Sequence, residues 1–382
     1  VWNSIPVPAQ HSIVLDDLLA LCKQYPGEGG VYAAIGVGEE FFILLRNDNQ
    51  KTEVVISDGA ALLDWDIAED AADLIELDWE DPAGLPASLV LKLAAENETN
   101  RAVSQQFNLY LKEVSYYKDL APRTTARSPR VYASEIDEAH NFFLLMEDVS
   151  SYRMGSQVAG ATLEECELCI DFLANLHASF WNQLSAVDWL PNMSDSDNAK
   201  NMAMGCEAGW PQLQEIFGEF VPDNIEAQRE HYLAAIPNLQ ARLDQHPKTL
   251  IHGDFRMDNM LFGQAPDHDS LLVVDFQGPL KGNGIQDVAY LLSHSAKTEV
   301  RREHERDLIA RYAKGLINAG IKDYSVEKAW NDYRVGVLYS WTVAVVIAGT
   351  MDPANDRGFA WMSKMVERNG LAINDLDCLA LL

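Results

Sequence analysis

Residues 250–277 limit the possible folds of this chain more than any other part of its sequence. The stretch 250–262 reads LIHGDFRMDNMLF, so that Asp254 follows a short apolar run and Asn259 stands five positions later. A second apolar run, LLVV, leads directly into Asp275. The pattern predicts two short β-strands, each of which ends at a loop that carries polar side chains.

An aspartate, four residues, an asparagine and then a strand that ends in Asp-Phe is the order found in kinase catalytic loops. In such a loop the first aspartate, here Asp254, reaches an acceptor hydroxyl and accepts its proton. The asparagine, here Asn259, and the second aspartate, here Asp275, bind metal ions on the nucleotide phosphates. Carboxylate and amide oxygens suit Mg²⁺, which is a hard cation. The alternative is that these residues only shape turns between strands.

A kinase site also requires a strand lysine followed by a helix glutamate. Lys92 is the one basic residue of the β-rich run SLVLKL at 88–93, and Glu113 lies in the run Asn100–Leu120, which has helical periodicity. We expect Lys92 to contact the α- and β-phosphates of ATP and Glu113 to hold it in place. The alternatives are a solvent-exposed lysine on an edge strand and an exposed charge on a helix.

Three further polar residues stand near these motifs or on a neighbouring helical run. Arg256 lies inside the catalytic loop, where it either meets the transferred phosphate or forms a salt bridge with a surface carboxylate. We expect His252 to brace the loop and not to act as the base. His177, in the helical run Leu163–Trp181, is expected to be a buried, hydrogen-bonded histidine.

The order of the elements predicts an α+β fold with two lobes. Strand-like runs dominate the first part of the chain, and helical patterns dominate after Leu163. We therefore place an N-terminal nucleotide-binding lobe at residues 1–147 and a C-terminal catalytic and acceptor-binding lobe at 148–382. The apolar run Val335–Met351 carries polar residues in its middle and has no basic flanking cluster, so we expect a buried helix and not a membrane span.

The segment that would cover the phosphates has two candidates. Gly36-Val37-Gly38 is a lone pair of glycines, which is weak evidence for such a loop. The expected strand Asp73–Trp79 should instead form a hairpin with Ser88–Leu93, which would place the cover loop in the acidic stretch before Asp73. Carboxylates near a triphosphate are repulsive, so the two interpretations conflict.

The chain resembles the aminoglycoside phosphotransferase and choline kinase branch of the protein-kinase-like fold. The resemblance rests on HGDFRMDN at 252–259, VVDFQ at 273–277 and GIQDVAY at 284–290. The triplet Asp-Phe-Gln and the phrase PASLVLK at 86–92 are similar to the ecdysteroid-kinase-like small-molecule kinases and their bacterial relatives. The resemblance covers residues 73 to 350 and implies a small antiparallel-sheet N-terminal lobe and a larger, mainly helical C-terminal lobe.

The resemblance also implies roles for individual residues. Asp254 would be the base, and Asn259 and Asp275 would be the metal ligands. The backbone from Glu147 to Val149 would be the hinge that pairs with adenine, and Asp287 would brace the catalytic loop. The Asp-Phe-Gln triplet replaces the Asp-Phe-Gly of protein kinases, and no Ala-Pro-Glu segment follows it, which argues against a protein substrate.

We therefore expect an ATP- and Mg²⁺-dependent phosphotransferase that moves the γ-phosphate to a hydroxyl of a small molecule. The alternatives are a catalytically silent kinase-like scaffold and a nucleotidyl transferase on the same fold. Amino sugars, choline-like alcohols, steroid-like alcohols and hydroxyacyl thioesters all remain open as acceptors, as do GTP in place of ATP and the oligomeric state.

The composition narrows the partners and the compartment. The chain has 29 basic and 58 acidic residues and a net charge of −29, which disfavours nucleic acids and anionic membranes as partners. Its five cysteines are irregularly spaced and odd in number, so they do not predict a disulfide framework. With no basic region followed by an apolar run at the start of the sequence, we expect a cytoplasmic protein.

Overall fold

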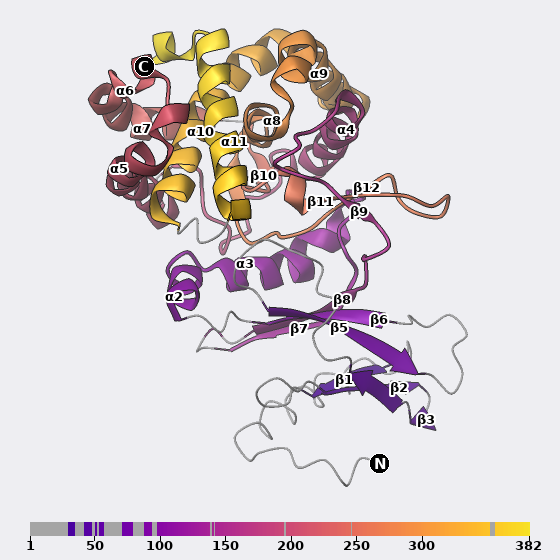
Figure 1. Cartoon of the computed structure of the whole chain (residues 1–382). Helices are drawn as coiled ribbons and strands as arrows, with labels where there is room; N and C mark the ends of the chain where they lie inside the picture. The colour runs from indigo at the N-terminus through magenta and orange to yellow at the C-terminus, as the bar shows by residue number, and fades with distance from the viewer. Residues whose placement is uncertain are drawn as a thin grey trace. The chain divides into compact units, whose positions relative to one another are not determined.

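The structure is a computed structural model of the whole chain, and two compact units make it up (Figure 1). It describes residues 30–34, 42–47, 50–51, 53–56, 71–78, 88–93, 98–137, 140, 142–194, 196–245, 247–351 and 356–382. The first unit comprises Val1–Val114 and Pro129–Ser151, and the second comprises Ser115–Ser128 and Tyr152–Leu382.

These units differ in two places from the lobes expected at 1–147 and 148–382. The first unit continues to Ser151, because the Asp148 carboxylate accepts a hydrogen bond from the Ser88 hydroxyl and so stays with the sheet. The segment 115–128 belongs to the second unit, where Tyr116 stacks on Phe276 with ring centroids 3.6 Å apart. Long-range contacts of this kind leave no periodic signal in the sequence.

The first unit is built on a five-stranded antiparallel sheet in the order β4-β5-β6-β8-β7. Its strands are β4 (Glu53–Ile56), β5 (Ala71–Asp78), β6 (Ser88–Leu93), β7 (Val131–Ile136) and β8 (Phe142–Glu147). A separate sheet contains β1 (Gly30–Ala34), β2 (Phe42–Asn47) and β3 (Gln50–Lys51). The middle of β6 and nearly all of β8 are buried, as expected of inner strands that read as continuous apolar runs.

The pairing of β5 with β6 confirms the predicted hairpin between these two strands. Strand β4 pairs with the other edge of β5, and in the sequence residues 57–70 join these two strands. This acidic connection and the other candidate cover loop, Gly36-Val37-Gly38, both lie outside the described residues.

The helical run predicted at Asn100–Leu120 is not one helix. It consists of α2 (Glu98–Gln106), α3 (Leu109–Ser115) and the π-helix η2 (Tyr116–Leu120). Asn108 separates the first two with φ +53°, a left-handed conformation that ends a helix and that asparagine tolerates well. Helix α3 packs on the sheet, since Tyr110 stacks on Phe142 of β8 with ring centroids 4.1 Å apart (Figure 1).

The second unit is mainly helical and is organised around α10 (Val326–Thr350). The other helices are α4 (Leu163–Phe180), α5 (Asp197–Phe217), α6 (Asp223–Glu226), α7 (Arg229–Leu243), α8 (Ile285–Tyr290), the π-helix η6 (Leu291–Ser295), α9 (Thr298–Asn318) and α11 (Asp356–Asp375). Short 3₁₀ turns are η3 (Ala121–Arg123), η4 (Gly218–Phe220), η5 (Met257–Asn259) and η7 (Cys378–Leu381). Helix α10 contacts α5, α7, α8, α9 and α11 (Figure 1).

Helix α10 is long and apolar enough to cross a membrane by length and composition alone, but 72% of its most apolar window is buried inside the protein. The predicted buried helix is therefore confirmed. Its crossing with α5 is close because two glycines meet there. A Cβ atom on Gly209 would lie 3.2 Å from the Cα of Gly349, so larger side chains at these positions would push the helices apart.

Two small β-structures of the second unit support the loops between its helices. Strands β10 (Thr249–Ile251) and β13 (Leu280–Gly282) pair antiparallel, and β9 (Arg153–Met154), β11 (Met260–Phe262) and β12 (Leu271–Val273) form a sheet in the order β12-β11-β9. Met260 pairs with Val273, and the Val274 amide donates to the Asn259 carbonyl at 3.1 Å. This register places Asn259 beside the residue that precedes Asp275.

Candidate active site

The predicted ion pair between Lys92 and Glu113 is present in the first unit. The Lys92 Nζ lies 3.1 Å from Oε1 and 3.0 Å from Oε2 of Glu113. The two side chains are only 3% and 1% exposed, and β6 is an inner strand of the sheet. Neither alternative, an edge-strand lysine or an exposed helix charge, holds. The buried Glu113 carboxylate of α3 thus fixes the position of the Lys92 ammonium group on the sheet.

The expected hinge lies at the end of β8. The Glu147 amide donates to the Arg130 carbonyl at 2.8 Å, and the Glu147 carboxylate accepts from the Arg130 amide at 2.9 Å. The Glu147 amide and carboxylate therefore both bond to the backbone of Arg130, which directly precedes β7. Val149 is buried at 2% exposure, two residues beyond the strand.

In the second unit, β10 leads straight into the loop that the sequence predicts to be catalytic. Gly253 has φ +88°, a conformation that L side chains rarely adopt, and a Cβ atom there would clash with the carbonyl oxygen of Gly278. A glycine between His252 and Asp254 is therefore needed for the chain to turn at this point. The turn brings the Asp254 side chain out of the buried strand.

The His252 side chain is fully buried, and both of its ring nitrogens are used within the loop. Nε2 lies 3.0 Å from the Val274 carbonyl and must donate to it, while Nδ1 accepts from the Asp254 amide at 3.2 Å. This tautomer leaves no lone pair for a substrate proton. His252 thus ties the loop to the strand end before Asp275, in agreement with the expected bracing role.

The Asp287 carboxylate of α8 also binds the backbone of this loop. It accepts from the His252 amide at 2.7 Å and from the Gly253 amide at 3.1 Å. His177 of α4 lies 3.2 Å from the same carboxylate, and its other ring nitrogen is 2.8 Å from the Tyr312 hydroxyl. His177 is therefore a buried, hydrogen-bonded histidine, as expected from the helical run that contains it.

Three donors orient the Asp254 carboxylate. The Tyr290 hydroxyl donates to Oδ1 at 2.8 Å, and Arg256 Nε and Asn259 Nδ2 both donate to Oδ2 at 3.2 Å. Burial raises the pKa of Asp254, but the Arg256 charge and the Tyr290 and Asn259 hydrogen bonds outweigh it, so the net pKa lies below its usual value. The side chain is nevertheless 30% exposed, so an ionised, oriented carboxylate faces solvent.

Arg256 is buried and forms salt bridges, but not with the surface carboxylates that one alternative proposed. It lies 3.2 Å from Asp254 and 3.4 Å from Asp258, and its guanidinium lies over the Trp361 ring of α11 at 4.8 Å. Burial lowers the pKa of Arg256, but these two carboxylates raise it above the ordinary value, so the side chain stays charged. Its charge is shared between two loop residues and holds Asp254 in place.

The nitrogen and the oxygen of the Asn259 side-chain amide differ in their contacts. The nitrogen donates to the Asp254 carbonyl at 2.9 Å and to the Asp254 carboxylate, whereas Oδ1 is buried and has no hydrogen-bond partner within the described part of the chain. Asp275, 5% exposed, follows β12 with φ +66°. A non-glycine residue in this conformation is uncommon and is typical of functional sites. An unpaired amide oxygen and a carboxylate on adjoining strand ends suit a hard cation.

Phe276 anchors the second strand end in the core. Its ring stacks on Tyr116 of η2 and lies 4.4 Å from the His252 ring, measured between centroids. The aromatic contact therefore links both halves of the loop region to the segment 115–128. Among the described residues no group of three or more histidine, cysteine, aspartate or glutamate side chains is arranged to hold a metal ion, so a cation here would rely on Asn259 as well as Asp275.

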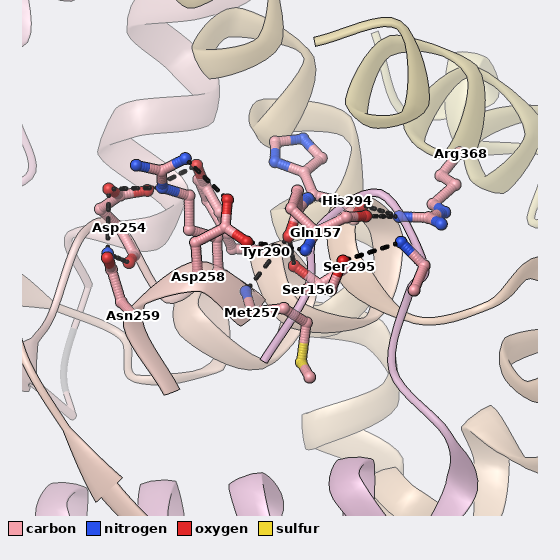
Figure 2. Close-up of polar contacts among 12 residues, drawn as sticks. Ser156, Gln157, Asp254, Met257, Asp258, Asn259, Tyr290, His294, Ser295 and Arg368 are labelled. Carbon is pink, nitrogen blue, oxygen red and sulfur yellow. Dashed lines mark hydrogen bonds and ion pairs between the residues drawn. The ribbon is translucent and has the colours of Figure 1, made fainter. Parts of the chain in front are cut away.

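The sequence did not reveal the polar network behind the loop (Figure 2). Gln157, in the connection between β9 and α4, donates its amide N–H to Asp258 at 2.8 Å and its side-chain N–H to the His294 carbonyl at 2.9 Å. Its side-chain oxygen accepts from the Met257 amide and the Ser295 hydroxyl. One buried glutamine thus connects the loop 252–259 to η6.

Arg368 of α11 completes this network. It donates to the backbone carbonyls of Gln157, Val158 and His294. Gly160 is packed against it with φ +77°, and a Cβ atom there would collide with the guanidinium. No sequence motif marked Gln157, Tyr290 or Arg368 as parts of the site, although Tyr290 ends the quoted run GIQDVAY.

The chain matches two family models. Residues 75–322, which are 248 of its 382 residues, match the model of the ecdysteroid kinase-like family. A second model, described as Rv3753c-like tRNA adenosine deaminase-associated protein, matches residues 1–87. None of the curated proteins matches the chain.

Solved structures share the fold at low sequence identity. A microcompartment-associated aminopropanol kinase is 14% identical with a TM-score of 0.50, over 87% of this chain and 94% of that one. An ethanolamine kinase of Plasmodium vivax is 13% identical with a TM-score of 0.47, over 83% and 82%. The GDP complex of wild-type aminoglycoside 2′-phosphotransferase-IIIa is 12% identical with a TM-score of 0.48, over 80% and 94%. The two units thus form a two-lobed, protein-kinase-like α+β fold.

Proposed function

Because the chain belongs to the ecdysteroid kinase-like family, we propose that it transfers the γ-phosphoryl group of ATP to a hydroxyl group of a small molecule. The observation that carries this proposal is the arrangement of Asp254 and Asn259. One amide group holds the base through its nitrogen, and its buried oxygen has no hydrogen-bond partner among the described residues. A turn between two strands requires neither feature.

Asp254 is the proposed base. Its carboxylate is ionised, partly exposed and held by three donors, so it can accept a hydrogen bond from an acceptor hydroxyl without reorganisation. The transition state of phosphoryl transfer is loose, and little proton transfer is needed before the phosphorus–oxygen bond forms. Orientation of the hydroxyl is then the main contribution of Asp254, and its three donors fix that orientation.

Asn259 and Asp275 fit a magnesium ion, since the unpaired Oδ1 and the carboxylate are the oxygen ligands that Mg²⁺ prefers. When bound, magnesium would neutralise charge on the nucleotide phosphates. Asn259 would at the same time keep its two bonds to Asp254, so the metal ligand and the base are positioned by one side chain. This link explains why the two residues stand five positions apart.

Lys92 is the proposed contact to the α- and β-phosphates, and Glu113 is its positioning residue. The backbone from Glu147 to Val149 is proposed to bind adenine. Arg256 is proposed to act on Asp254 and not on the phosphate, because both of its salt bridges are already formed with Asp254 and Asp258.

The proposed acceptor is a small molecule. Gln277 stands where protein kinases have the glycine of Asp-Phe-Gly, and the sequence has no Ala-Pro-Glu segment that would position a peptide. The fold that the chain shares with solved small-molecule kinases is consistent with this proposal.

The test is incubation of the purified protein and Mg²⁺ with an alcohol library, in parallel with γ-labelled and α-labelled ATP. Label from γ-labelled ATP alone should appear in one or more alcohols, and the Asp254→Ala variant should lose this product while it binds ATP within a few fold of the parent. Product labelled from α-labelled ATP would indicate nucleotidyl transfer instead. Absence of any labelled alcohol in the parent would refute the proposed function.

A further inference from the structure

The second unit contains a cavity of about 280 Å³ beside the start of β10. Lys248 directly precedes this strand, and Lys281 of β13 pairs with Leu250 in its middle. The segment that follows α4 supplies the other lining residues. The full set is Asn182, Leu184, Ser185, Asn192, Lys248 and Lys281. None of the six belongs to the loop 252–259, so the cavity is separate from the proposed base.

The charge of this cavity is opposite to that of the chain. The sequence has 58 acidic and 29 basic residues, yet both charged residues that line the cavity are lysines. Three of the four neutral lining residues, Asn182, Ser185 and Asn192, carry side-chain N–H or O–H groups. A concave site that is lined by ammonium groups and other donors attracts an anion, even when the net charge of the protein is negative.

Lys281 is fixed in place, and its charge has no counter-ion within the described part of the chain. Its amide donates to the Pro191 carbonyl at 2.7 Å, and its carbonyl accepts from the Met193 amide at 2.8 Å. The side-chain Nζ donates to the Val187 carbonyl at 3.0 Å. An ammonium group has three donors, so this bond leaves two of them for a ligand. The described salt bridges do not include Lys281, so its charge is not neutralised by them.

Lys248, by contrast, is already paired with one carboxylate. Its Nζ lies 2.9 Å from Asp244 Oδ1 and donates to Asn192 Oδ1 at 3.3 Å. Because the Asn192 oxygen is the acceptor in this bond, the N–H groups of the same amide remain as donors. One carboxylate against the two ammonium groups of Lys248 and Lys281 leaves a single positive charge at the cavity.

A carboxylate matches this charge and these donors. It carries one negative charge, whereas a phosphate monoester carries about −1.5 to −2 at pH 7. Each of its two oxygens accepts hydrogen bonds, so it can contact an ammonium and an amide together. The stems of the lysines and the buried Leu184 add apolar surface for the rest of the ligand. The volume lies near the lower end of the range for ligand sites, so the ligand is small.

We propose that this cavity binds the carboxylate of a small organic acid, with Lys281 as its charge partner and Lys248 and Asn192 as further donors. The inference does not depend on the proposed phosphoryl transfer, because no lining residue takes part in it. The competing interpretation is that Lys281 only stabilises the segment 182–192 through the Val187 carbonyl and that water fills the cavity.

The test is calorimetric titration of the purified protein with benzoate, with benzamide as a neutral analogue of the same shape and phenyl phosphate as a dianion. Benzoate should bind most tightly of the three. Lys281→Met should weaken benzoate binding by about tenfold, because it removes a charge-assisted contact, whereas Lys281→Arg keeps the charge and should stay within about threefold of the parent. Equal affinities for benzoate and benzamide, or tighter binding of phenyl phosphate, would overturn the carboxylate site.

Nuclear magnetic resonance locates the bound benzoate. In the parent labelled with ¹³C at lysine Cε, benzoate should shift the Lys281 signal, which Lys281→Met identifies, and benzamide should not. Lys328→Met is the matched control, since Lys328 also pairs with an aspartate four residues away, Asp332 at 3.0 Å, but does not line the cavity. It should keep benzoate affinity within about twofold. An unshifted Lys281 signal at saturating benzoate would refute the site.

A second pair of variants keeps the test decisive if Lys281→Met fails to fold. Ser185 lines the cavity from an exposed position, so its replacement should leave the fold intact. Ser185→Asp adds a negative charge and should weaken benzoate binding by about fivefold, whereas Ser185→Asn has the same shape without the charge and should stay within about twofold. Equal benzoate affinities of these two variants would contradict the proposal.

Discussion

Replacement of Tyr290 by phenylalanine removes one of the three donors that hold the Asp254 carboxylate and leaves the rest of the ring. The lost bond is 2.8 Å long and has a charged acceptor, and such bonds contribute about 1.5–3 kcal/mol. Arg256 and Asn259 still hold the other carboxylate oxygen at 3.2 Å, so we expect the lower end of this range. At about 1.4 kcal/mol per factor of ten, kcat should fall by roughly tenfold.

The assay is acceptor-dependent ADP release by the parent and by Tyr290→Phe, with the best alcohol found in the library screen. Because Tyr290 acts through Asp254 and does not touch the nucleotide in our proposal, kcat and kcat/KM for the acceptor should fall together. The dissociation constant of ATP should stay within twofold. A lower kcat with an unchanged ATP dissociation constant distinguishes a lost positioning contact from a general loss of structure.

Tyr232→Phe is the matched control. Tyr232 is also fully buried, and its hydroxyl bonds to the Leu338 carbonyl and the Thr342 hydroxyl and not to Asp254. Tyr232→Phe should lose about 1 kcal/mol of unfolding free energy and Tyr290→Phe about 1.5 kcal/mol, because only the second acceptor is charged, but only Tyr290→Phe should lose turnover. If both variants lose turnover equally, or if Tyr290→Phe keeps more than half of it, the donor role of Tyr290 is wrong.

Three further predictions follow from other contacts. Asp275→Asn should weaken ATP binding in Mg²⁺ more than in its absence, because one charge is lost at a hard-cation site; equal titrations with and without Mg²⁺ would exclude that role. Removal of either Lys92 or Glu113 alone should destabilise the protein by about 3 kcal/mol, since the other charge stays buried. The double variant Lys92→Met/Glu113→Leu should be close to neutral in urea unfolding, and its ATP affinity should be no lower than that of the worse single variant. Additive losses would mean that the pair does not act as a unit. Burial lowers the pKa of His294 from 6.5 to about 3, so between these pH values the unfolded chain binds a proton that the folded chain does not. The free energy of unfolding therefore falls as pH falls from 6.5 towards 3, by about 1.4 kcal/mol per pH unit. His294→Phe should therefore lose about 2 kcal/mol less than the parent between pH 7 and pH 5, and parallel unfolding curves would contradict this.

The loop that carries Asp254 and Asn259 could be predicted from the sequence because its contacts are local. Asp254 and Asn259 are joined within five residues, and Gly253 is required by the turn that immediately precedes Asp254. The Lys92–Glu113 pair was also predictable, since an inner strand and the helix that follows it place two such residues on facing sides. The separation into a sheet lobe and a helical lobe follows from hydrophobic periodicity, which reports whether a segment is a strand or a helix.

Where periodicity was the only signal, it missed backbone breaks. The run 100–120 keeps its apolar spacing through Asn108, although the left-handed conformation of that residue ends a helix there. The partners of Arg256 were also undetermined by sequence, because a cation in an acidic chain has many possible carboxylates. Only the folded loop shows that Asp254 and Asp258 are the ones in contact.

The tertiary structure alone decided which distant side chains surround Asp254. Tyr290 is 36 residues from Asp254, and Gln157 is 101 residues from Asp258, so their hydrogen bonds depend on how α8 and the segment after β9 pack behind the loop. The complete burial of His294 is likewise a property of packing, because a histidine in an apolar helix reads in sequence as an ordinary core residue. Sequence specifies local spacing, whereas the burial and pairing of polar atoms depend on every element packed around them.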